Sequence, residues 1–473
     1  MNLLFVFTDE QRADTMRAYG CAAMETPHLD ALAAESVVFD RCYCTQSVCT
    51  PSRASILTGR WPHTCGCTRN NVPLPADVPC VPEMTAGYRT AYFGKWHLGD
   101  EIFAQHGFEH WVSIEDMYRK HYREGRDRAA RSTYHHWLVD KGYAPNAKDG
   151  VFSRSFAARL PEGHCKPAYL AYGFAQWMKA LPQGEPFIAY INFLEPHMPF
   201  YGPRDGQYDP AAIDLPPNFD HPPDESNHPK ARLLYEKYQG GYDMYDLSAE
   251  RGWRELIANY RGLVSQVDAA LGDVLEALRN AGAGDDTLIV FTSDHGDMMG
   301  SHRLLAKTVQ FEEAVRVPLL IRSPGVAPRH ESQPVSQIDL APTLLDLLGA
   351  PAPSELQGQS LRGLIERREP LEYRDVFIEW TGPDCGLSAL ERDTSDEVAS
   401  AVNDPIRTVI TADGWKLNHS ATLGRHELFN LAGDPYELMN LFGRPETKSR
   451  VEDLKYRLRA WGVRTNDPVA AGI

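Results

Sequence analysis

Short apolar runs, each followed by polar or charged residues, recur along this chain of 473 residues. They lie at Asn2–Thr8, Thr90–Phe93, Phe187–Phe193, Thr287–Thr292 and Pro318–Arg322. Runs of this length are typical of strands buried on both faces of a parallel sheet. Helix-like segments lie between them, and in Tyr260–Ala281 the apolar side chains recur every three or four residues. The alternation predicts an α/β fold, with a doubly wound, mostly parallel sheet sandwiched by helices.

The end of the chain has a different pattern. The Pro-rich passage Ala350–Ser360 is typical of a linker, and strand-like segments and a closing helix at Lys448–Trp461 follow it. We therefore expect a main domain over residues 1–365 and a smaller C-terminal α+β domain, with a short antiparallel sheet, over residues 366–473. Two polar regions, about residues 111–184 and 201–253, are expected to be irregular insertions over the ligand-binding edge of the main sheet.

The charge balance limits the classes of partner. Lys and Arg number 48 and Asp and Glu number 64, so the net charge is 48 − 64 = −16, which argues against nucleic acid or an acidic membrane surface. No apolar run approaches the roughly 18 residues of a membrane span. The opening run reaches Thr8 and Asp9 too early for a secretory signal, so we expect a cytoplasmic protein. An anionic ligand would need a locally positive pocket.

The cysteines do not suggest a disulfide framework. Their number is odd, and the chain shows no export signal, so most are expected to be buried thiols. The nine are Cys21, Cys42, Cys44, Cys49, Cys65, Cys67, Cys80, Cys165 and Cys385.

Two acidic pairs follow predicted strands. Asp9 and Glu10 come after the first apolar run, and Asp294 and His295 come after the run Thr287–Thr292. Open α/β sheets bind ligands at the carboxyl ends of their strands, and converging carboxylates repel unless a cation intervenes. The pairs therefore indicate a hard divalent cation. They are equally compatible with a helix cap at Asp9 and a turn at Asp294.

The segment CTPSRASILTGR, from Cys49 to Arg60, places a thiol where a helix would begin. Backbone N–H groups and the guanidinium of Arg53 would surround that thiol and favour an anion. By itself the segment is also compatible with a core thiol or with a plain cysteine nucleophile.

A series of motifs across nearly the whole chain resembles the formylglycine-dependent sulfatases of the alkaline-phosphatase superfamily, which are related to phosphonate monoester hydrolases. The motifs are FTDEQRADT, TPHLDALAAESVVFDRCYC, the Cys-x-Pro-Ser-Arg signature at Cys49–Arg53, GKWHLG, EPHMPF, SDHGDMMGSHRLLAK, RVPLLIR and ELFNLAGDPYELMNL. The resemblance implies an alkaline-phosphatase-like fold.

The resemblance also implies a modified nucleophile. A formylglycine-generating enzyme would oxidise Cys49 to an aldehyde, whose hydrate attacks the sulfur of a sulfate ester. The second hydroxyl then releases sulfate and restores the aldehyde. One divalent cation would be held by Asp9, Glu10, modified Cys49, Asp294 and His295. Calcium is expected first, and magnesium and manganese are the alternatives because His295 stands where many relatives have Asn.

The remaining roles also come from the resemblance. Arg53, Lys95 and Lys307 would bring positive charge to the transferred group. His97 and His197 would handle protons of the nucleophile and of the departing alcohol, and which does which stays open. Asn70, Lys95, His197 and Lys307 would contact the substrate, although Asn70 is also compatible with a simple turn.

The expected activity is hydrolysis of a sulfate monoester of a sugar or of an aryl or alkyl alcohol. One alternative is a phosphonate monoester or phosphodiester hydrolase of the same fold, favoured by Asn70 and disfavoured by Lys95. The other is a catalytically silent binder of sulfated ligands in which Cys49 remains a thiol. The sequence is also compatible with a homo-oligomer that associates through the insertions or the C-terminal segment, although it does not indicate the oligomeric state.

Overall fold

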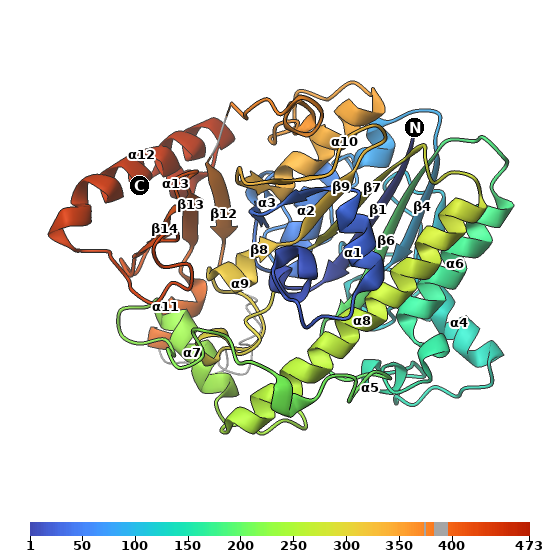
Figure 1. Ribbon diagram of the computed structural model, residues 1–473, viewed down its shortest axis with the longest axis horizontal. Coiled ribbons are helices and arrows are strands. Elements are labelled where there is room, and N and C mark those ends of the chain that lie inside the picture. The colour runs from blue at the N-terminus through green and yellow to red at the C-terminus, as the bar shows by residue number, and fades with distance from the viewer. Residues whose placement is uncertain (373–374, 383–395) are drawn as a thin grey trace.

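A mixed sheet of eight strands forms the centre of the computed structural model, which describes residues 1–372, 375–382 and 396–473 (Figure 1). In spatial order the strands are β10 (Arg329–Glu331), β2 (Val37–Phe39), β9 (Leu319–Arg322), β7 (Thr287–Ser293), β1 (Asn2–Asp9), β6 (Phe187–Pro196), β4 (Arg89–Gly94) and β5 (His110–Ser113). Only β9 runs antiparallel to its neighbours in this sheet. The predicted mostly parallel sheet is confirmed.

Helices cover both faces of this sheet (Figure 1). One face packs against α1 (Pro27–Ala34), α6 (Lys166–Ala180) and α8 (Glu250–Asn280), and the other against α2 (Cys49–Thr58) and α10 (Leu340–Leu348). In β1 the side chains of Leu3, Phe5 and Phe7 enter one core and those of Leu4 and Val6 enter the other. Alternate residues of a strand point to opposite faces, so a continuous apolar run is what a sheet covered on both faces requires.

The prediction that residues 111–184 are irregular is wrong for part of this region. It contains α4 (Thr133–Asp140), α5 (Arg154–Ala157) and the 15-residue helix α6. Leu170, Phe174 and Met178 lie four residues apart on α6 and are buried. Tyr172 and Trp177, which lie between them, mask this spacing in the sequence. The region from 201 to 253 likewise contains α7 (Pro229–Tyr238), and α8 begins at Glu250, ten residues before the predicted start at Tyr260.

The predicted C-terminal antiparallel sheet is confirmed. It contains β12 (Val376–Trp380), β13 (Ile406–Ile410), β14 (Trp415–Ser420) and β15 (Glu427–Asn430), with α11 (Asp396–Asn403), α12 (Lys448–Thr465) and α13 (Pro468–Ala471) nearby. A separate three-stranded sheet contains β11 (Val335–Ser336), β3 (Cys42–Tyr43) and β8 (Arg316–Val317). Two further short helices are α3 (Pro62–Cys65) and α9 (Glu312–Val315). The backbone N–H of Glu379 donates to the Thr45 carbonyl at 2.8 Å, so β12 is joined to the part of the chain that leads into α2.

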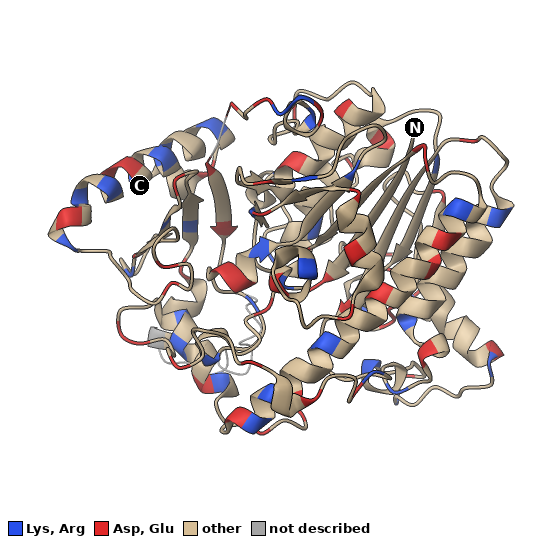
Figure 2. Ribbon diagram, viewed as in Figure 1, with Lys and Arg blue, Asp and Glu red and all other residues tan. Residues whose placement is uncertain are grey.

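The charged residues and the cysteines are distributed as in an ordinary globular protein. Acidic and basic side chains are interspersed along α8 and α12, so neither helix presents a surface of one sign (Figure 2). None of the described helices combines the length and the apolar character needed to cross a membrane. The eight described cysteines are free, and seven of them are buried. Cys385 lies outside the described residues.

Gly94, the last residue of β4, allows β4 and β6 to approach each other beside the carboxyl edge of the sheet. Its φ is +118°, and a Cβ atom there would overlap the backbone oxygen of Asn192. We expect Gly94→Ala to lower the free energy of unfolding by about 3 kcal/mol, because steric overlap adds to an unfavourable φ. Urea denaturation measures this loss. Gly142→Ala is the matched control, since Gly142 also has a positive φ (+88°) but open space around it, and it should cost only about 1 kcal/mol. Equal losses in the two variants would contradict the role of the close approach.

Candidate active site

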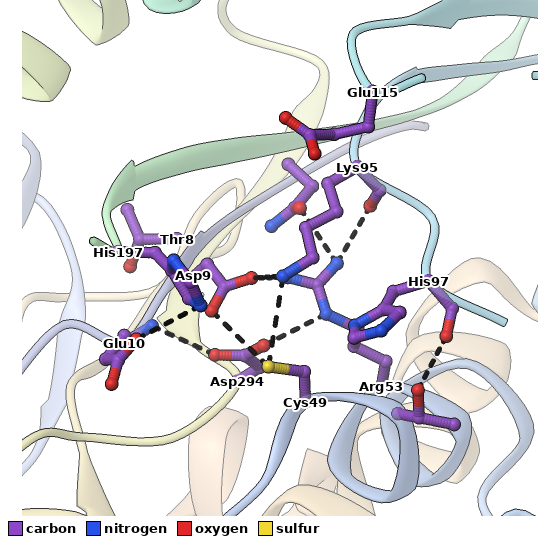
Figure 3. A network of polar contacts seen from close by, with 12 residues as sticks. Thr8, Asp9, Glu10, Cys49, Arg53, Lys95, His97, Glu115, His197 and Asp294 are labelled. Atoms are coloured by element: carbon purple, nitrogen blue, oxygen red, sulfur yellow. Dashed lines mark hydrogen bonds and ion pairs between the residues drawn. The ribbon is translucent and has the colours of Figure 1, made fainter. Parts of the chain in front are cut away.

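The carboxyl ends of four neighbouring strands bring the predicted polar residues to one edge of the sheet. Asp9 ends β1, Lys95 follows β4, His197 follows β6 and Asp294 follows β7. These strands are adjacent and parallel, in the order β7, β1, β6, β4, so their carboxyl ends lie side by side. Figure 3 shows side chains from all four strands meeting around Cys49. Asp9 therefore ends a strand and does not cap a helix.

Cys49 lies at the start of α2 and points toward the ends of these strands (Figure 3). Its Sγ is 3.3 Å from His295 Nε2, 3.7 Å from Asp9 Oδ1 and 3.8 Å from Lys95 Nζ. The side chain is fully buried, yet its neighbours are polar, which is unlike a core thiol. Burial, together with the charge of Asp9, raises the pKa of the Cys49 thiol to about 11. An unmodified thiol here is therefore neutral at pH 7 and is a poor nucleophile.

Arg53, one turn along α2, joins the two predicted acidic positions. Its Nη2 donates to Asp9 Oδ2 at 2.8 Å, and its Nε donates to Asp294 Oδ2 at 2.9 Å. Nη1 donates to Asn192 Oδ1 and to the Lys95 carbonyl, both at 2.8 Å. All three charged side chains are inaccessible to solvent. The planar guanidinium thus holds one oxygen of each carboxylate and orients the other.

The donor atoms around Cys49 fit a divalent cation. Ligand atoms of Asp9, Cys49, Asp294 and His295 all lie within 4.8 Å of one another. The ring Nδ1 of His295 is 2.9 Å from the Gly296 carbonyl oxygen, which can only accept, so Nδ1 carries the proton. The lone pair of Nε2 is then free on the side that faces Cys49. A backbone carbonyl that fixes the tautomer in this way is common behind metal-binding histidines.

Glu10 lies on the other side of Asp9 and also offers a free oxygen. Its Oε2 accepts from Lys307 Nζ at 2.7 Å and lies 3.3 Å from His197 Nε2. Its Oε1 is buried and has no hydrogen-bond partner among the described residues. Burial raises the pKa of Glu10 to about 8, and Lys307 opposes that rise. Asp9, Glu10 and His197 form a second group whose ligand atoms lie within 4.8 Å of one another.

Asp9 is the carboxylate that the surrounding cations stabilise most clearly. Its burial would raise its pKa, but Lys95, His197 and Arg53 together hold that pKa well below the usual value. Lys95 Nζ donates directly to Asp9 Oδ2. Asp9 is therefore ionised throughout the neutral range, and its Oδ1 remains directed toward Cys49 and His295.

His97 is held beside this group by residues that the sequence did not single out. Its Nε2 lies 3.1 Å from Asn71 Oδ1, and its ring packs on that of Tyr118 with a centroid distance of 4.3 Å. Burial and the charges of Lys95 and Arg53 lower the pKa of His97 well below its usual value, so the ring is neutral. With Nε2 donating to Asn71, Nδ1 is an unpaired acceptor.

Asn70 lies next to the start of α2. Its Oδ1 accepts from the backbone N–H of Thr50 at 3.0 Å, which ties it to the residue after Cys49. Asn71 has a φ of +65°, so the pair also forms a turn. The structure thus brings Asn70 to the edge of the site through an amide oxygen that is already engaged.

Several buried polar residues of the site were missed in the sequence. Asn192 contacts Arg53 from within β6, and Gln337 accepts a hydrogen bond from Ser52 at 2.7 Å. Asn192 could have been found as a polar residue near the carboxyl end of a predicted buried strand. Gln337 and Tyr118 carry no local signal, because only the packing of distant segments places them here.

Comparison with known proteins assigns the fold and the family. Residues 1–350 match the Sulfatase family model. The ulvan-active sulfatase of Formosa agariphila is 28% identical over 97% of this chain and 80% of its own length. The N-acetylglucosamine-6-O-sulfatase of Bacteroides thetaiotaomicron is 27% identical over 99% of this chain and 87% of its own.

Among solved structures, the phosphonate monoester hydrolase of Silicibacter pomeroyi superposes with a TM-score of 0.80 and 27% identity, covering 99% of this chain and 96% of that one. The predicted alkaline-phosphatase-like fold is thereby confirmed. Since the family model spans most of the chain, from β1 through α10, this protein belongs to the sulfatase family of the alkaline-phosphatase superfamily, a family of sulfuric ester hydrolases.

Proposed function

We propose that this protein hydrolyses a sulfate monoester to an alcohol and inorganic sulfate, with a formylglycine made from Cys49 as the source of the nucleophile. The observation that carries the proposal is the position of Cys49, whose Sγ lies within 4 Å of Asp9, Lys95 and His295. A nucleophile there would meet both a cation site and a positively charged side chain.

Modification of Cys49 answers a chemical difficulty. A buried, neutral thiol at this position has little nucleophilic character, and a sulfated thiol or serine would be hard to release. A formylglycine hydrate supplies one hydroxyl that attacks sulfur and a second that allows sulfate to leave. We expect a transient encounter with a formylglycine-generating enzyme before or during folding, because Cys49 is fully buried in the folded chain.

The proposed cation ligands are Asp9, Glu10, the modified Cys49, Asp294 and His295. The first four offer oxygen, as calcium prefers, and His295 offers a nitrogen that magnesium or manganese also accepts. When bound, such a cation supplies Lewis-acid polarisation of a sulfate oxygen and of the nucleophile.

The side chains around Cys49 have separable roles in this proposal. Arg53 orients Asp9 and Asp294, and Lys95 and Lys307 stabilise charge on the transferred group. Neutral His97, with a free Nδ1, accepts a proton from the hydrate. His197, whose Nδ1 donates to the Met198 carbonyl, takes up a proton at Nε2 and then hydrogen-bonds or protonates the oxygen of the departing alcohol. Asn70 contributes an amide N–H group to the substrate.

Lys307 gives a direct test of charge stabilisation. We expect Lys307→Ala to lower kcat/KM about 10²-fold, because it removes a buried positive charge from the site of the transferred group. Steady-state kinetics with an aryl sulfate measure the loss. Arg303→Ala is the matched control, since it removes a partly exposed charge of the same loop that pairs with Asp220. Full activity of Lys307→Ala would contradict its assigned role.

Phosphonate monoester hydrolysis is the second candidate, supported by the similarity to the Silicibacter pomeroyi enzyme and by Asn70. Lys95 favours sulfate, as the resemblance of its motif to that of sulfatases implies. Measuring kcat/KM for matched aryl sulfate and aryl phosphonate esters separates the two. We expect the sulfate ester to be preferred. A large preference for the phosphonate ester would instead make phosphonate hydrolysis the leading candidate.

Mass spectrometry of the Cys49 peptide from the native host tests the modification itself. The aldehyde is expected, and a uniformly unmodified thiol would favour a silent binder of sulfated ligands.

The two sulfatase relatives have names that refer to sulfated saccharides, so we propose a sulfated sugar or a simple aryl or alkyl sulfate as substrate. We further propose a cytoplasmic location and self-association.

A further inference from the structure

Arg154 lies beside His197 but has no part in the proposed transfer of sulfate. It begins the short helix α5, within the region between β5 and α6. Its Nη1 is 3.5 Å from His197 Nδ1, and its side chain is 16% exposed. Arg154 thus places a guanidinium beside the imidazole that, in the proposed function, meets the departing oxygen.

The Nη1 group of Arg154 has no acceptor. His197 Nδ1 is 2.8 Å from the carbonyl oxygen of Met198, and a carbonyl can only accept, so Nδ1 carries a proton. That nitrogen cannot also accept from Arg154. No other acceptor for Nη1 lies within hydrogen-bonding distance in the part of the chain that the structure describes. Buried or half-buried donors are normally paired, so this edge of the guanidinium is expected to meet a ligand.

The opposite edge of Arg154 is firmly anchored. Its Nε and Nη2 lie 2.9 Å and 2.8 Å from Glu115 Oε2. Glu115 is drawn near Lys95 in Figure 3, and its other oxygen contacts Lys166 Nζ. Burial would raise the pKa of Glu115, but Arg154 and Lys166 lower it to about 2, so one carboxylate is shared by two cations.

The nearby carboxyl of Glu195 does not fully neutralise this charge. Burial raises its pKa to about 7, so it is only partly ionised at neutral pH. Glu115 and a partly ionised Glu195 together carry less negative charge than the positive charge of Arg154 and Lys166.

Tyr118 adds a second donor at the same place. Its hydroxyl oxygen accepts from Arg154 Nη2 at 2.9 Å, which leaves the hydroxyl proton free to donate elsewhere. The ring of Tyr118 also packs against His97. Two donors thus lie between the two proposed proton-transfer histidines, and a carboxylate or sulfonate matches a guanidinium edge with an adjacent hydroxyl.

We propose that Arg154 and Tyr118 bind a second anionic group on the alcohol half of the substrate, so that the enzyme selects sulfate esters of acidic alcohols over neutral ones. This inference rests on the proposed sulfatase function. A neutral alcohol would leave Arg154 Nη1 unpaired in a partly desolvated site, and such loss of a charged hydrogen bond discriminates strongly between substrates.

Three aryl sulfates with the same ring test this selectivity. They carry a carboxylate, a sulfonate or a neutral carboxamide at the same ring position, so the first two separate the two kinds of anion. We expect Arg154→Gln to lower the ratio of kcat/KM for the charged esters to that for the carboxamide by about 10-fold or more. Comparing ratios cancels the intrinsic reactivity of each ester. Arg128→Gln, which removes an exposed charge from the same region, should leave the ratio unchanged.

A binding measurement separates this inference from the function on which it rests. In the Cys49→Ala background, which cannot turn over, calorimetry should show about 10-fold weaker binding of the charged esters when Arg154→Gln is added. If Arg154→Gln does not fold, Arg154→Lys and Tyr118→Phe replace it, and each should lower the same ratio by a smaller factor. Unchanged ratios in both assays would overturn the anion site. Absence of turnover by formylglycine-containing protein, with the difference in affinity retained, would instead count against the hydrolase and leave the anion site standing.

Discussion

Replacing Cys49 with alanine is expected to lower kcat/KM by about 10⁴-fold or more, because no other side chain of the site can supply the hydrate that attacks sulfur. The measurement is steady-state hydrolysis of an aryl sulfate by protein whose aldehyde content has been determined by mass spectrometry. The variant should fold normally, since only one sulfur atom is lost and the ion pairs of Arg53 with Asp9 and Asp294 remain.

Cys80→Ala is the matched control for this experiment. Cys80 is also a fully buried cysteine, but it belongs to the hydrophobic cluster on the face of the sheet that α2 and α10 cover. Its replacement should cost a similar small amount of stability and leave kcat/KM within a few-fold of the original. Activity retained by Cys49→Ala, at a normal melting temperature, would exclude position 49 as the source of the nucleophile.

Asp294→Ala is expected to have the second largest effect, about 10³-fold in kcat/KM, with loss of the bound cation. The carboxylate is a proposed cation ligand, and it also accepts from Arg53 Nε at 2.9 Å and from the backbone N–H groups of Glu10 and His295. Removing one partner of a buried ion pair leaves the other charge unpaired, so we also expect the free energy of unfolding to fall by about 3–5 kcal/mol. Metal content per chain, kinetics and urea denaturation measure the three effects.

Asp268→Ala is the control for Asp294→Ala, because it separates the effect on catalysis from the effect on stability. Asp268 is also a buried carboxyl that accepts two backbone N–H groups, those of His28 and Leu29, but it lies on α8 away from the site. This variant should lose stability and keep its metal and its kcat/KM. Asp294→Asn preserves the shape of the side chain, and a normal metal content in that variant together with full activity would contradict the ligand assignment.

Five of the eight strands of the main sheet were predictable because their signal is local, whereas the short strands β2, β5 and β10 were not predicted. Phe187–Phe193 and Thr287–Thr292 are apolar on both faces, and only a strand covered on both sides buries such a run. Helix α6 was missed because Tyr172 and Trp177 interrupt the spacing of Leu170, Phe174 and Met178. Trp177 packs against Phe93 and Phe187 of two strands, and such a tertiary contact does not follow the apolar periodicity of the helix.

Part of the candidate site was also predictable, because the signals of those residues lie in short segments of the sequence. Asp9 and Asp294 were found because they follow strands whose ends face the ligand-binding edge, and Cys49 because its surrounding motif is distinctive. Asn71, Tyr118 and Arg154 were not found, since their places depend on how the segments between strands pack over that edge.

The sequence by itself determined five strands of the main sheet, the residues at their carboxyl ends and the resemblance to sulfatases, because these properties depend on short contiguous segments. The tertiary structure alone decided which of those residues meet. Arg53 joins Asp9 and Asp294, which are 44 and 241 positions away, and Arg154 reaches His197 across 43. Such pairings follow from the order of the strands and the packing of the loops. Burial of apolar surface over the whole chain decides both, so no local sequence pattern predicts them.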